Sequence, residues 1–322
     1  MQDTIGDTHP RTPLDAHRRA VALLTVLFSA SCWGLSGTAA QVLFEHHHIL
    51  PGWLVAVRMT LSGATLLAFG VLQKRRGGQG IGAVWGNPAA RMQLVVFAFA
   101  GLGAVQYAYF AAIATGNAAT ATLLQYLGPS MVVGYTAARM RRWPRTAEWI
   151  ALMMALTGTA LLVTNGSFRH LGVPAVSAVW GIASAITLAF YTIYPVRLIK
   201  VWGAVPVVGW AMLIGGIGVS LLTQPWSLPA GSWTIGVAAI LAFIVIFGTA
   251  LPFGLYLASL RHLSPSETSL LASAEPLSAS IAAVWLLHVH MGGGEIAGGV
   301  LIVLAVILIA RRPGQAAPPP AP

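Results

Sequence analysis

The chain alternates between long apolar runs and short polar breaks. A helix that spans a lipid bilayer needs about 20 mainly apolar residues, and runs of this length recur along almost the whole sequence. The breaks between them contain the Gly, Pro, Asn, Lys and Arg residues that end helices or form turns. The pattern predicts an all-α integral membrane protein with ten transmembrane helices, over residues 20–44, 52–72, 92–113, 117–139, 147–165, 174–195, 204–224, 233–258, 264–289 and 292–310.

The composition agrees with this prediction. Hydrophobic residues make up 57% of the 322 residues and charged residues only 8%, whereas soluble domains carry about 25% charged residues. A soluble or a disordered protein is therefore excluded. The polar residues 1–17 and the Pro-rich residues 313–322 are expected to be disordered tails. Because no cleavable signal peptide is apparent, the first helix is expected to act as an uncleaved insertion signal.

The basic residues predict the orientation in the membrane. The formal net charge of +10 would suggest nucleic acid as a partner of a soluble protein. If the N-terminus is cytoplasmic, however, 16 of the 18 Lys and Arg residues fall in cytoplasmic segments, with Arg169 outside and Arg58 within a span. Basic residues collect in cytoplasmic loops, so we expect cytoplasmic termini, an inner (plasma) membrane location and no nucleic-acid partner. The single cysteine, Cys32, excludes an intrachain disulfide.

An internal repeat appears when the sequence is shifted by 147 residues. The aligned pairs are Trp33 with Trp180, Gly34 with Gly181, Gly101 with Gly248, Tyr109 with Tyr256, Pro129 with Pro276, and Glu148 with Glu295. The offset predicts two five-helix repeats, over residues 18–165 and 166–312. Because five is odd, the second repeat enters the membrane from the opposite side. Alternating-access transporters use such inverted repeats, with the binding site near the midplane.

At this point the chain resembles a known family. The matching segments are SASCWGLSGTAAQ in the first helix, VAVRMTLSGATLL in the second, TATLLQYLGPSMVVGY in the fourth, and SETSLLASAEPLSASIAAVWLL with GGGEIAGGVLIVLAVILI in the last two. They are similar to the EamA branch of the drug/metabolite transporter superfamily. The resemblance covers about residues 18–312 and implies a ten-helix transporter of small molecules. It implies little about the substrate, since the family includes exporters of amino acids, drugs and other metabolites.

Two charged residues lie within predicted spans, where a charge costs about 2.5–3.5 kcal/mol on insertion scales. Glu275 is near the bilayer midplane, and the following Pro276 has no N–H and so leaves a carbonyl one turn earlier without its donor. This carboxyl group is a candidate for binding the substrate or a proton; alternatively, a protonated Glu275 ties down the free backbone. Arg58 is expected to pair with Glu275 or with a substrate carboxylate, or else to extend to the outer interface.

Polar and aromatic residues follow one face of several predicted helices. In the sixth helix Ser177, Trp180, Ser184, Thr187, Tyr191 and Tyr194 recur at helical spacing. Aromatic walls with a few polar groups are typical of small-molecule sites, but small polar residues also pack helices together and Tyr residues also mark interfaces. The candidate substrate-binding or coupling residues besides Glu275 and Arg58 are Trp33, Trp180, Ser184, Gln106, Tyr109, Tyr256, Gln125 and Tyr191.

The ninth helix has two polar faces. One carries Glu275, Thr268 and Ser278, and the other carries Ser269, Ser273, Pro276 and Ser280. We expect the Glu275 face to line the site, because burying a charge against lipid costs more than burying a serine. Pro129 and Pro276 are expected to kink the fourth and ninth helices.

Several chemistries lack the residues they need. The adjacent His46, His47 and His48 are expected to be a solvated loop rather than a metal site, since neighbouring histidines rarely converge on one ion. The chain has no ATP-binding glycine motif, and no Ser-His-acid set that could meet within the membrane. We therefore expect no enzymatic activity, cofactor or metal.

The function predicted from these observations is secondary or facilitative transport of small metabolites. Export of amino acids by alternating access, with protons as a possible coupling ion, is the first hypothesis. Export of cationic or aromatic drugs is the alternative, because a deep acid beside aromatic rings suits cations. The alternative of another class is a non-transporting scaffold or sensor. Small-residue faces are compatible with a monomer or a homodimer.

Overall fold

The computed structural model describes residues 13–74, 80–139, 141, 143, 146–167, 172–226, 234–259, 263, 271–272 and 274–310. All regular secondary structure within these residues is helical. The α-helices are α1 (Pro13–His47), α2 (Pro51–Lys74), α3 (Pro88–Val96), α4 (Ala104–Thr115), α5 (Ala118–Gln125), α6 (Gly128–Arg139), α7 (Thr146–Thr164), α8 (Ala175–Ile193), α9 (Val196–Trp202), α10 (Ala204–Thr223), α11 (Ile235–Val245), α12 (Leu251–Ser259), α14 (Ala274–Leu287) and α15 (Gly293–Ala310). A short 3₁₀ segment, η1 (Ala83–Gly86), and two π-helical segments, η2 (Phe97–Gly103) and η3 (Ile246–Ala250), complete the set.

Six described helices are long and apolar enough to cross a membrane. They are Arg19–His47, Pro51–Leu72, Pro88–Thr115, Thr146–Thr164, Ala175–Ile193 and Ala204–Thr223. Three shorter apolar helices are Ile235–Ala250, Ala274–Leu287 and Gly293–Leu308. These nine segments overlap predicted spans, and the fourth predicted span contains α5 and α6. The count of ten spans and the position of the termini stay predictions.

The structure differs from the expectation in several local features. Helix α1 begins at Pro13, within the segment expected to be disordered, and Pro suits the first turn of a helix. The fourth predicted span is two helices, α5 and α6, separated by Tyr126 and Leu127. Its break precedes Pro129, which has no N–H to donate to the carbonyl of Gln125. Residues 1–12 and 311–322 lie outside the described residues, as does Arg169.

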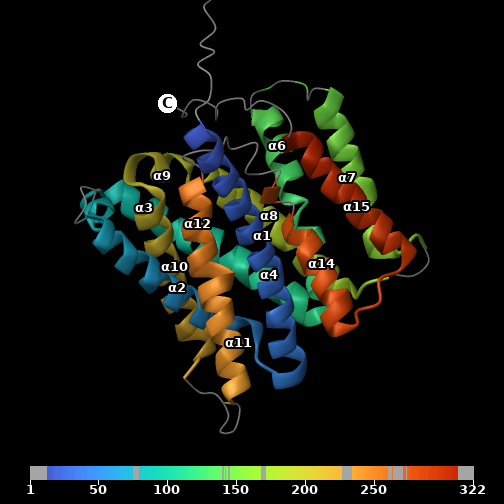
Figure 1. Cartoon of the computed structure of the whole chain (residues 1–322), viewed down its shortest axis with the longest axis horizontal. Coiled ribbons are helices and arrows are strands. Elements are labelled where there is room, and N and C mark those ends of the chain that lie inside the picture. The colour runs from blue at the N-terminus through green and yellow to red at the C-terminus, as the bar shows by residue number, and fades with distance from the viewer. Residues whose placement is uncertain are drawn as a thin grey trace, which may run out of the picture.

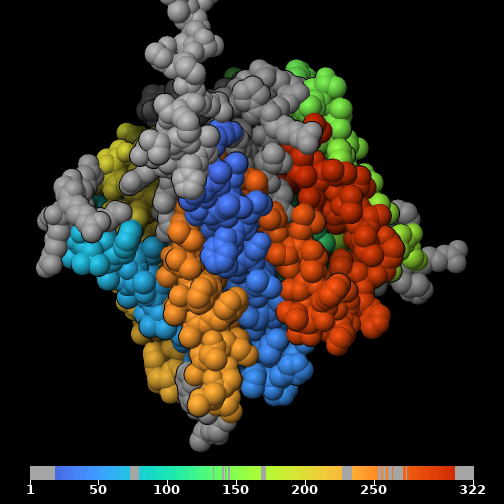
Figure 2. Space-filling model, in the orientation of Figure 1, coloured from blue at the N-terminus to red at the C-terminus, as the bar shows by residue number. Residues whose placement is uncertain are grey.

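Helix α1 forms the centre of the packing. It contacts α14 on one side and α11, η3 and α12 on the other, and Figure 1 shows it between these helices. Figure 2 shows α1, in blue, lying between the light-orange and the red-orange helices on the surface of this face. Helix α8 contacts α4, η2, α5 and α6 in an analogous way. The helices that meet here therefore come from both predicted repeats.

Two further helix pairs complete the bundle. Helix α2 packs along α10, and α7 packs along α15. At the α7–α15 crossing, a Cβ on Gly158 would lie 2.7 Å from the carbonyl oxygen of Gly298. Only glycine permits this backbone approach, which is the small-residue packing that apolar helices use in membranes.

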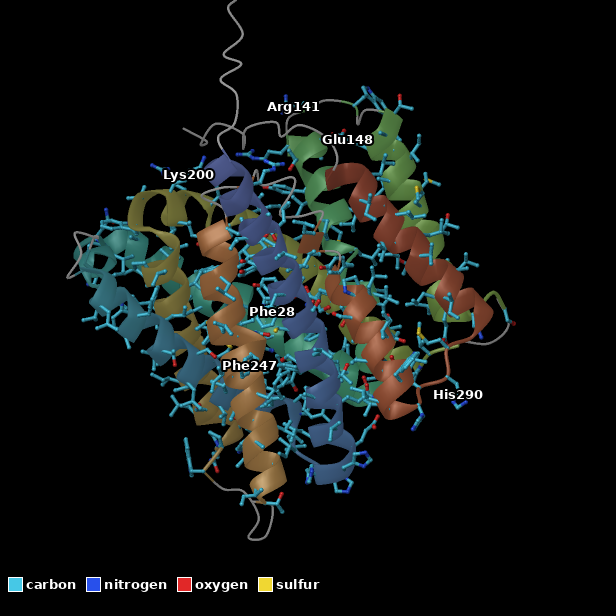
Figure 3. All side chains as sticks on the ribbon, in the orientation of Figure 1. Phe28, Arg141, Glu148, Lys200, Phe247 and His290 are labelled. Atoms are coloured by element: carbon cyan, nitrogen blue, oxygen red, sulfur yellow. The ribbon has the colours of Figure 1, made fainter. Side chains whose placement is uncertain are left out.

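The outer surface is suited to lipid. Phe28 and Phe247 are 47% and 39% exposed, and Figure 3 shows them midway along the face that α1 and α11 present. Arg141, Glu148 and Lys200 lie at the end of the molecule where α1 begins, and His290 lies toward the other end. This distribution of charged and apolar side chains fits a bilayer crossed lengthwise by α1.

Candidate functional site

Glu275 lies in the first turn of α14, at the centre of the bundle, and its side chain is half-buried. Helix α1 holds this turn in place. A Cβ on Gly34 of α1 would lie 2.5 Å from the carbonyl oxygen of Glu275 and 2.7 Å from the backbone nitrogen of Ala279. The Ser278 hydroxyl donates to the Glu275 carbonyl at 2.9 Å and approaches the Ser31 carbonyl of α1 at 3.5 Å. The backbone beside the carboxyl group is therefore fixed by close contact with α1.

The hydroxyl of Tyr126 contacts this carboxyl group. Tyr126 follows α5, at the break before α6, and is 8% exposed. Its hydroxyl lies 3.2 Å from Oε2 of Glu275 and donates to the carbonyl of Ala272 at 2.5 Å. Ala272 precedes Pro276 by four residues, so its carbonyl is the one that Pro276 leaves without a helical donor. In this structure the Tyr126 hydroxyl, rather than Glu275, is the side chain that donates to this carbonyl.

Arg58 is buried in α2 and points into the protein, with 6% of its side chain exposed. Its Nε donates to the Thr249 hydroxyl at 2.5 Å and its Nη2 donates to the Gly248 carbonyl at 2.8 Å. The guanidinium also lies over the Phe110 ring, 5.1 Å from the ring centroid. The alternative that Arg58 extends to the outer interface therefore does not hold in this structure.

Arg58 and Glu275 are close enough for a Coulombic attraction. They nevertheless do not form the direct ion pair considered from the sequence, because the guanidinium donates to η3 instead. Glu275 also interacts electrostatically with Tyr109 and Tyr256. Within the described residues, the carboxyl group of Glu275 thus has phenol groups near it. The guanidinium of Arg58 is hydrogen-bonded to Thr249 and Gly248 instead.

The π-helical segments η2 and η3 occupy related places in the sequence. The residues of η3, Ile246–Ala250, lie 147 positions after 99–103, which are the last five residues of η2. A π-helical turn interrupts the regular α-helical hydrogen bonds and is frequent at functional sites. In η3 it presents the Gly248 carbonyl and the Thr249 hydroxyl to Arg58. The sequence shows no signal for either segment beyond the aligned Gly101 and Gly248.

The predicted aromatic residues form separate contacts rather than one continuous wall. Trp33 of α1 packs on Tyr256 of α12, with ring centroids 5.4 Å apart. Tyr109 shares a 2.8 Å hydrogen bond with Thr122 of α5. Trp180 meets Tyr107 edge to face at 5.5 Å, and Tyr191 stacks on Phe97 at 5.7 Å. Trp33, Tyr109 and Tyr256 are thus brought toward Glu275, and Tyr191 interacts electrostatically with Tyr256. Trp180 instead packs α8 against α4.

The small polar residues of α8 pack helices together. Ser184 is fully buried and donates to the Gly181 carbonyl of its own helix at 2.8 Å. Ser177 is also fully buried and donates to the Ala112 carbonyl of α4 at 2.9 Å. Their hydroxyls are therefore satisfied by backbone carbonyls, which is typical of helix packing.

The predicted amides lie near the centre without hydrogen-bond partners among the described residues. Gln106 of α4 is partly exposed and Gln125 at the end of α5 is buried. Of the two proline sites, Pro129 lies in the first turn of α6, after the break, and Pro276 lies in the first turn of α14. On the second polar face of the ninth span, Ser269 and Ser273 lie outside the described residues, as does Thr268.

Four residues of this centre were not predicted from the sequence. They are Thr122, Tyr126, Thr249 and Ala272. The first three form a hydrogen bond with a predicted residue, and Ala272 accepts one from Tyr126. The proline rule signals Ala272 indirectly, because it identifies the carbonyl that lacks a donor. Tyr126 lies within the quoted fourth-helix motif, three residues before Pro129.

The described residues contain no group of three or more His, Cys, Asp or Glu side chains arranged to hold a metal ion. His46 and His47 end α1, and the exposed His48 has a positive φ of 52°. The arrangement around Glu275 instead offers one carboxyl group, several hydroxyls and aromatic rings. Such a site can exchange a proton or attract a positively charged group.

Comparison with known proteins gives consistent matches. The EamA-like transporter family model matches twice, over residues 20–164 and 175–311. The chain is 36% identical to the uncharacterized inner membrane transporter YicL of Salmonella typhimurium strain LT2, over 92% of this chain and 98% of that protein. It is 26% identical to the uncharacterized transporter YwfM of Bacillus subtilis strain 168, over 90% of this chain and 94% of that protein. A crystal structure with 22% identity has the same fold, with a TM-score of 0.59 over 92% of this chain and 99% of that chain.

Proposed function

We propose a mechanism from the premise that this chain belongs to the EamA-like transporter family and is a multi-pass protein of the inner membrane. In this proposal it exports amino acids or related small metabolites by alternating access. Two inverted five-helix repeats, residues 18–165 and 166–312, rock around a site that contains Glu275. The process is secondary or facilitative transport and needs no cofactor.

The observation that carries the proposal is the environment of Glu275. Its carboxyl group lies half-buried at the centre of the bundle, contacted by Tyr126 and without an ion pair to a described cation. One carboxylate can bind a proton or the ammonium group of a substrate, but it cannot pair fully with both. Alternate occupation of this kind couples the exit of substrate to the entry of a proton.

The paired π-helical segments support the repeat architecture. They interrupt the third and eighth predicted spans at positions 147 residues apart, beside the central contacts of α1 and α8. A helix interrupted at the same place in both halves provides a bending point that each half can use in turn. Two matches of one family model to successive parts of the chain support the same division.

The direct test uses purified full-length protein in liposomes loaded with a mixed pool of labelled amino acids. We expect efflux, and we expect an acidic outer buffer to accelerate it. Glu275→Gln should abolish the acceleration, because its amide cannot take up and release a proton. The matched control is Glu45→Gln, which alters an exposed carboxyl group near the end of α1. Glu275→Gln with wild-type dependence on the pH gradient would contradict the proposed coupling role.

A second candidate is export of organic cations. It is favoured by the engagement of Arg58 with Thr249 and Gly248, which leaves that guanidinium unavailable for a substrate carboxylate in this conformation. The same liposomes loaded with a labelled quaternary ammonium compound test it. Efflux of the cation without efflux of amino acids favours this candidate. Efflux of neither favours a non-transporting scaffold or sensor.

A further inference from the structure

Two proline-containing spans meet at the Tyr126 hydroxyl. Pro129 and Pro276 lie 147 residues apart, so each removes a donor from a corresponding carbonyl, that of Gln125 in one span and that of Ala272 in the other. Tyr126 comes directly after Gln125, at the break between α5 and α6. Its hydroxyl reaches across to the Ala272 carbonyl at 2.5 Å. A side chain at the break before Pro129 thus supplies the donor that Pro276 cannot give to the Ala272 carbonyl.

The same hydroxyl contacts the carboxyl group of Glu275 at 3.2 Å. A tyrosine hydroxyl has one proton to donate and can also accept hydrogen bonds. When Glu275 is protonated, its carboxyl group donates to the Tyr126 oxygen, and the Tyr126 proton remains directed at the Ala272 carbonyl. All three groups are then satisfied. The shorter distance to Ala272 fits this arrangement.

Ionisation of Glu275 changes the hydrogen bonds among these three groups. The carboxylate has no proton to donate, so it and the Ala272 carbonyl both need the single Tyr126 proton. Hydrogen bonds to an ionised acceptor are about twice as strong as neutral ones, so the carboxylate takes it. The partly buried Ala272 carbonyl then loses the donor that Tyr126 supplied, which destabilises the contact between α5 and α14.

We propose that Tyr126 is a positioning residue that couples protonation of Glu275 to the contact between the two proline-containing spans. The proposal rests on the transport function proposed above and deepens it, because it assigns how the proton changes the conformation. Protonation closes the contact and loss of the proton loosens it. The proton leaves Glu275 for water; Tyr126 keeps its own proton and only changes the acceptor to which it donates.

The other titratable groups that face Glu275 in the described residues do not compete with Tyr126 for its carboxyl group in this structure. They are Arg58 of α2, Tyr109 of α4 and Tyr256 of α12. Arg58 donates to Thr249 and Gly248, and the Tyr109 hydroxyl is paired with Thr122. Helix α1 presents backbone to this turn, through Ser31 and Gly34. Arg58 and the phenols keep their charge state between about pH 4.5 and about pH 8.5.

The test is hydrogen exchange of the purified full-length protein in lipid nanodiscs, which requires no substrate. Exchange rates of amides in peptides covering residues 274–280 are compared at about pH 4.5 and about pH 8.5, after correction for the intrinsic pH dependence. We expect wild type to exchange at least about fivefold faster at the higher pH. Glu275→Gln should stay slow at both, and Tyr126→Phe should be fast at both, since the Ala272 carbonyl then always lacks its donor.

Two further variants keep the result interpretable. Glu275→Asp retains the charge but withdraws the carboxylate from Tyr126, so the slow exchange should persist at both pH values even if Tyr126→Phe does not fold. Tyr135→Phe changes an exposed tyrosine of α6 and should behave as wild type. A wild-type pH response in Tyr126→Phe or in Glu275→Asp would overturn the proposal, as would a wild-type protein without any pH response.

Flux in liposomes separates this inference from the proposed function. If Tyr126 acts as proposed, efflux by Tyr126→Phe should no longer be accelerated by a pH gradient. The variant should still exchange labelled substrate when the substrate concentration is equal on both sides. Absence of all substrate flux in the wild-type protein contradicts the proposed function but does not affect the hydrogen-exchange result. Normal gradient-driven flux in Tyr126→Phe overturns the inference and leaves the transport function intact.

Discussion

Arg58 of α2 donates a 2.8 Å hydrogen bond to the backbone carbonyl of Gly248 in η3, so a buried charge is held by backbone that a π-helical turn makes available. The partners come from opposite predicted repeats. The contact satisfies a cation that would otherwise be costly inside the membrane. It also ties α2 to the interrupted eighth span.

Arg58→Gln should lower the free energy of unfolding by about 2–3 kcal/mol, because it removes hydrogen bonds from a charged donor to buried acceptors. Thermal unfolding of the purified protein in detergent measures this change. Arg58→Lys should restore only part of the loss, since an ammonium lacks the planar pair of donors that contacts Thr249 and Gly248. Arg91→Gln, at an exposed position of α3, is the control. Equal melting temperatures for all variants would refute a stabilising role.

Gly34→Ala should destabilise the contact between α1 and α14. Its Cβ would lie 2.5 Å from the Glu275 carbonyl oxygen and 2.7 Å from the Ala279 nitrogen, which is closer than normal packing allows. Overpacking of this kind costs about 1–3 kcal/mol, and efflux should fall because the Glu275 turn is displaced. The control, Gly134→Ala in α6, meets no atom within 4 Å. If both variants unfold and transport alike, the close contact at Gly34 is not important.

Asn165→Ala should cost about 1 kcal/mol of stability through loss of a helix cap. The Asn165 side-chain oxygen accepts from the backbone nitrogens of Gly294 and Glu295, at 2.8 Å and 3.2 Å, at the start of α15. Because the Asn165 side chain bonds to the start of α15 rather than to the Glu275 turn, efflux should remain near the wild-type rate. Asn165→Asp retains an acceptor and should recover the melting temperature. Failure of this rescue would indicate that the capping bonds are not responsible.

Trp33→Leu should distinguish the two proposed substrate classes. Trp33 packs on Tyr256, with the ring centroids 5.4 Å apart, and Tyr256 interacts electrostatically with Glu275. If the substrate is an organic cation, the affinity for a quaternary ammonium probe should fall by about fivefold to tenfold, since cation–π contacts contribute about 1 kcal/mol or more. Equilibrium binding of the labelled probe measures it. Trp285→Leu, at a position of α14 that is 79% exposed, is the control. An unchanged affinity in Trp33→Leu would exclude this ring from cation binding.

Much of the secondary structure was predictable because it depends on local pattern. The apolar runs predicted the helical segments closely, and the six described spans lie within or overlap them. The missing N–H of Pro129 agrees with the break between α5 and α6, whereas the kink expected at Pro276 stays a prediction. The π-helical segments were not predicted, because a run such as FAFAGLG has the composition of an ordinary apolar helix.

The candidate site was only partly predictable. A charge in an apolar run singled out Glu275 and Arg58 without any structure. The hydrogen-bond partners of these two residues could not be predicted in the same way. Tyr126 is 149 residues from Glu275 and Thr249 is 191 residues from Arg58, and no local pattern relates positions so far apart.

The sequence by itself determined that this chain is a helical membrane protein, that its halves align at a fixed offset, and that Glu275 and Arg58 lie within apolar runs. These properties follow from hydropathy, helical spacing and the chemistry of single residues. Only the tertiary structure decided that Tyr126 donates a hydrogen bond to the Ala272 carbonyl, and that Arg58 donates to η3 rather than to Glu275. The physical reason is that buried polar groups need hydrogen-bond partners, and which partner each group finds depends on how distant helices pack.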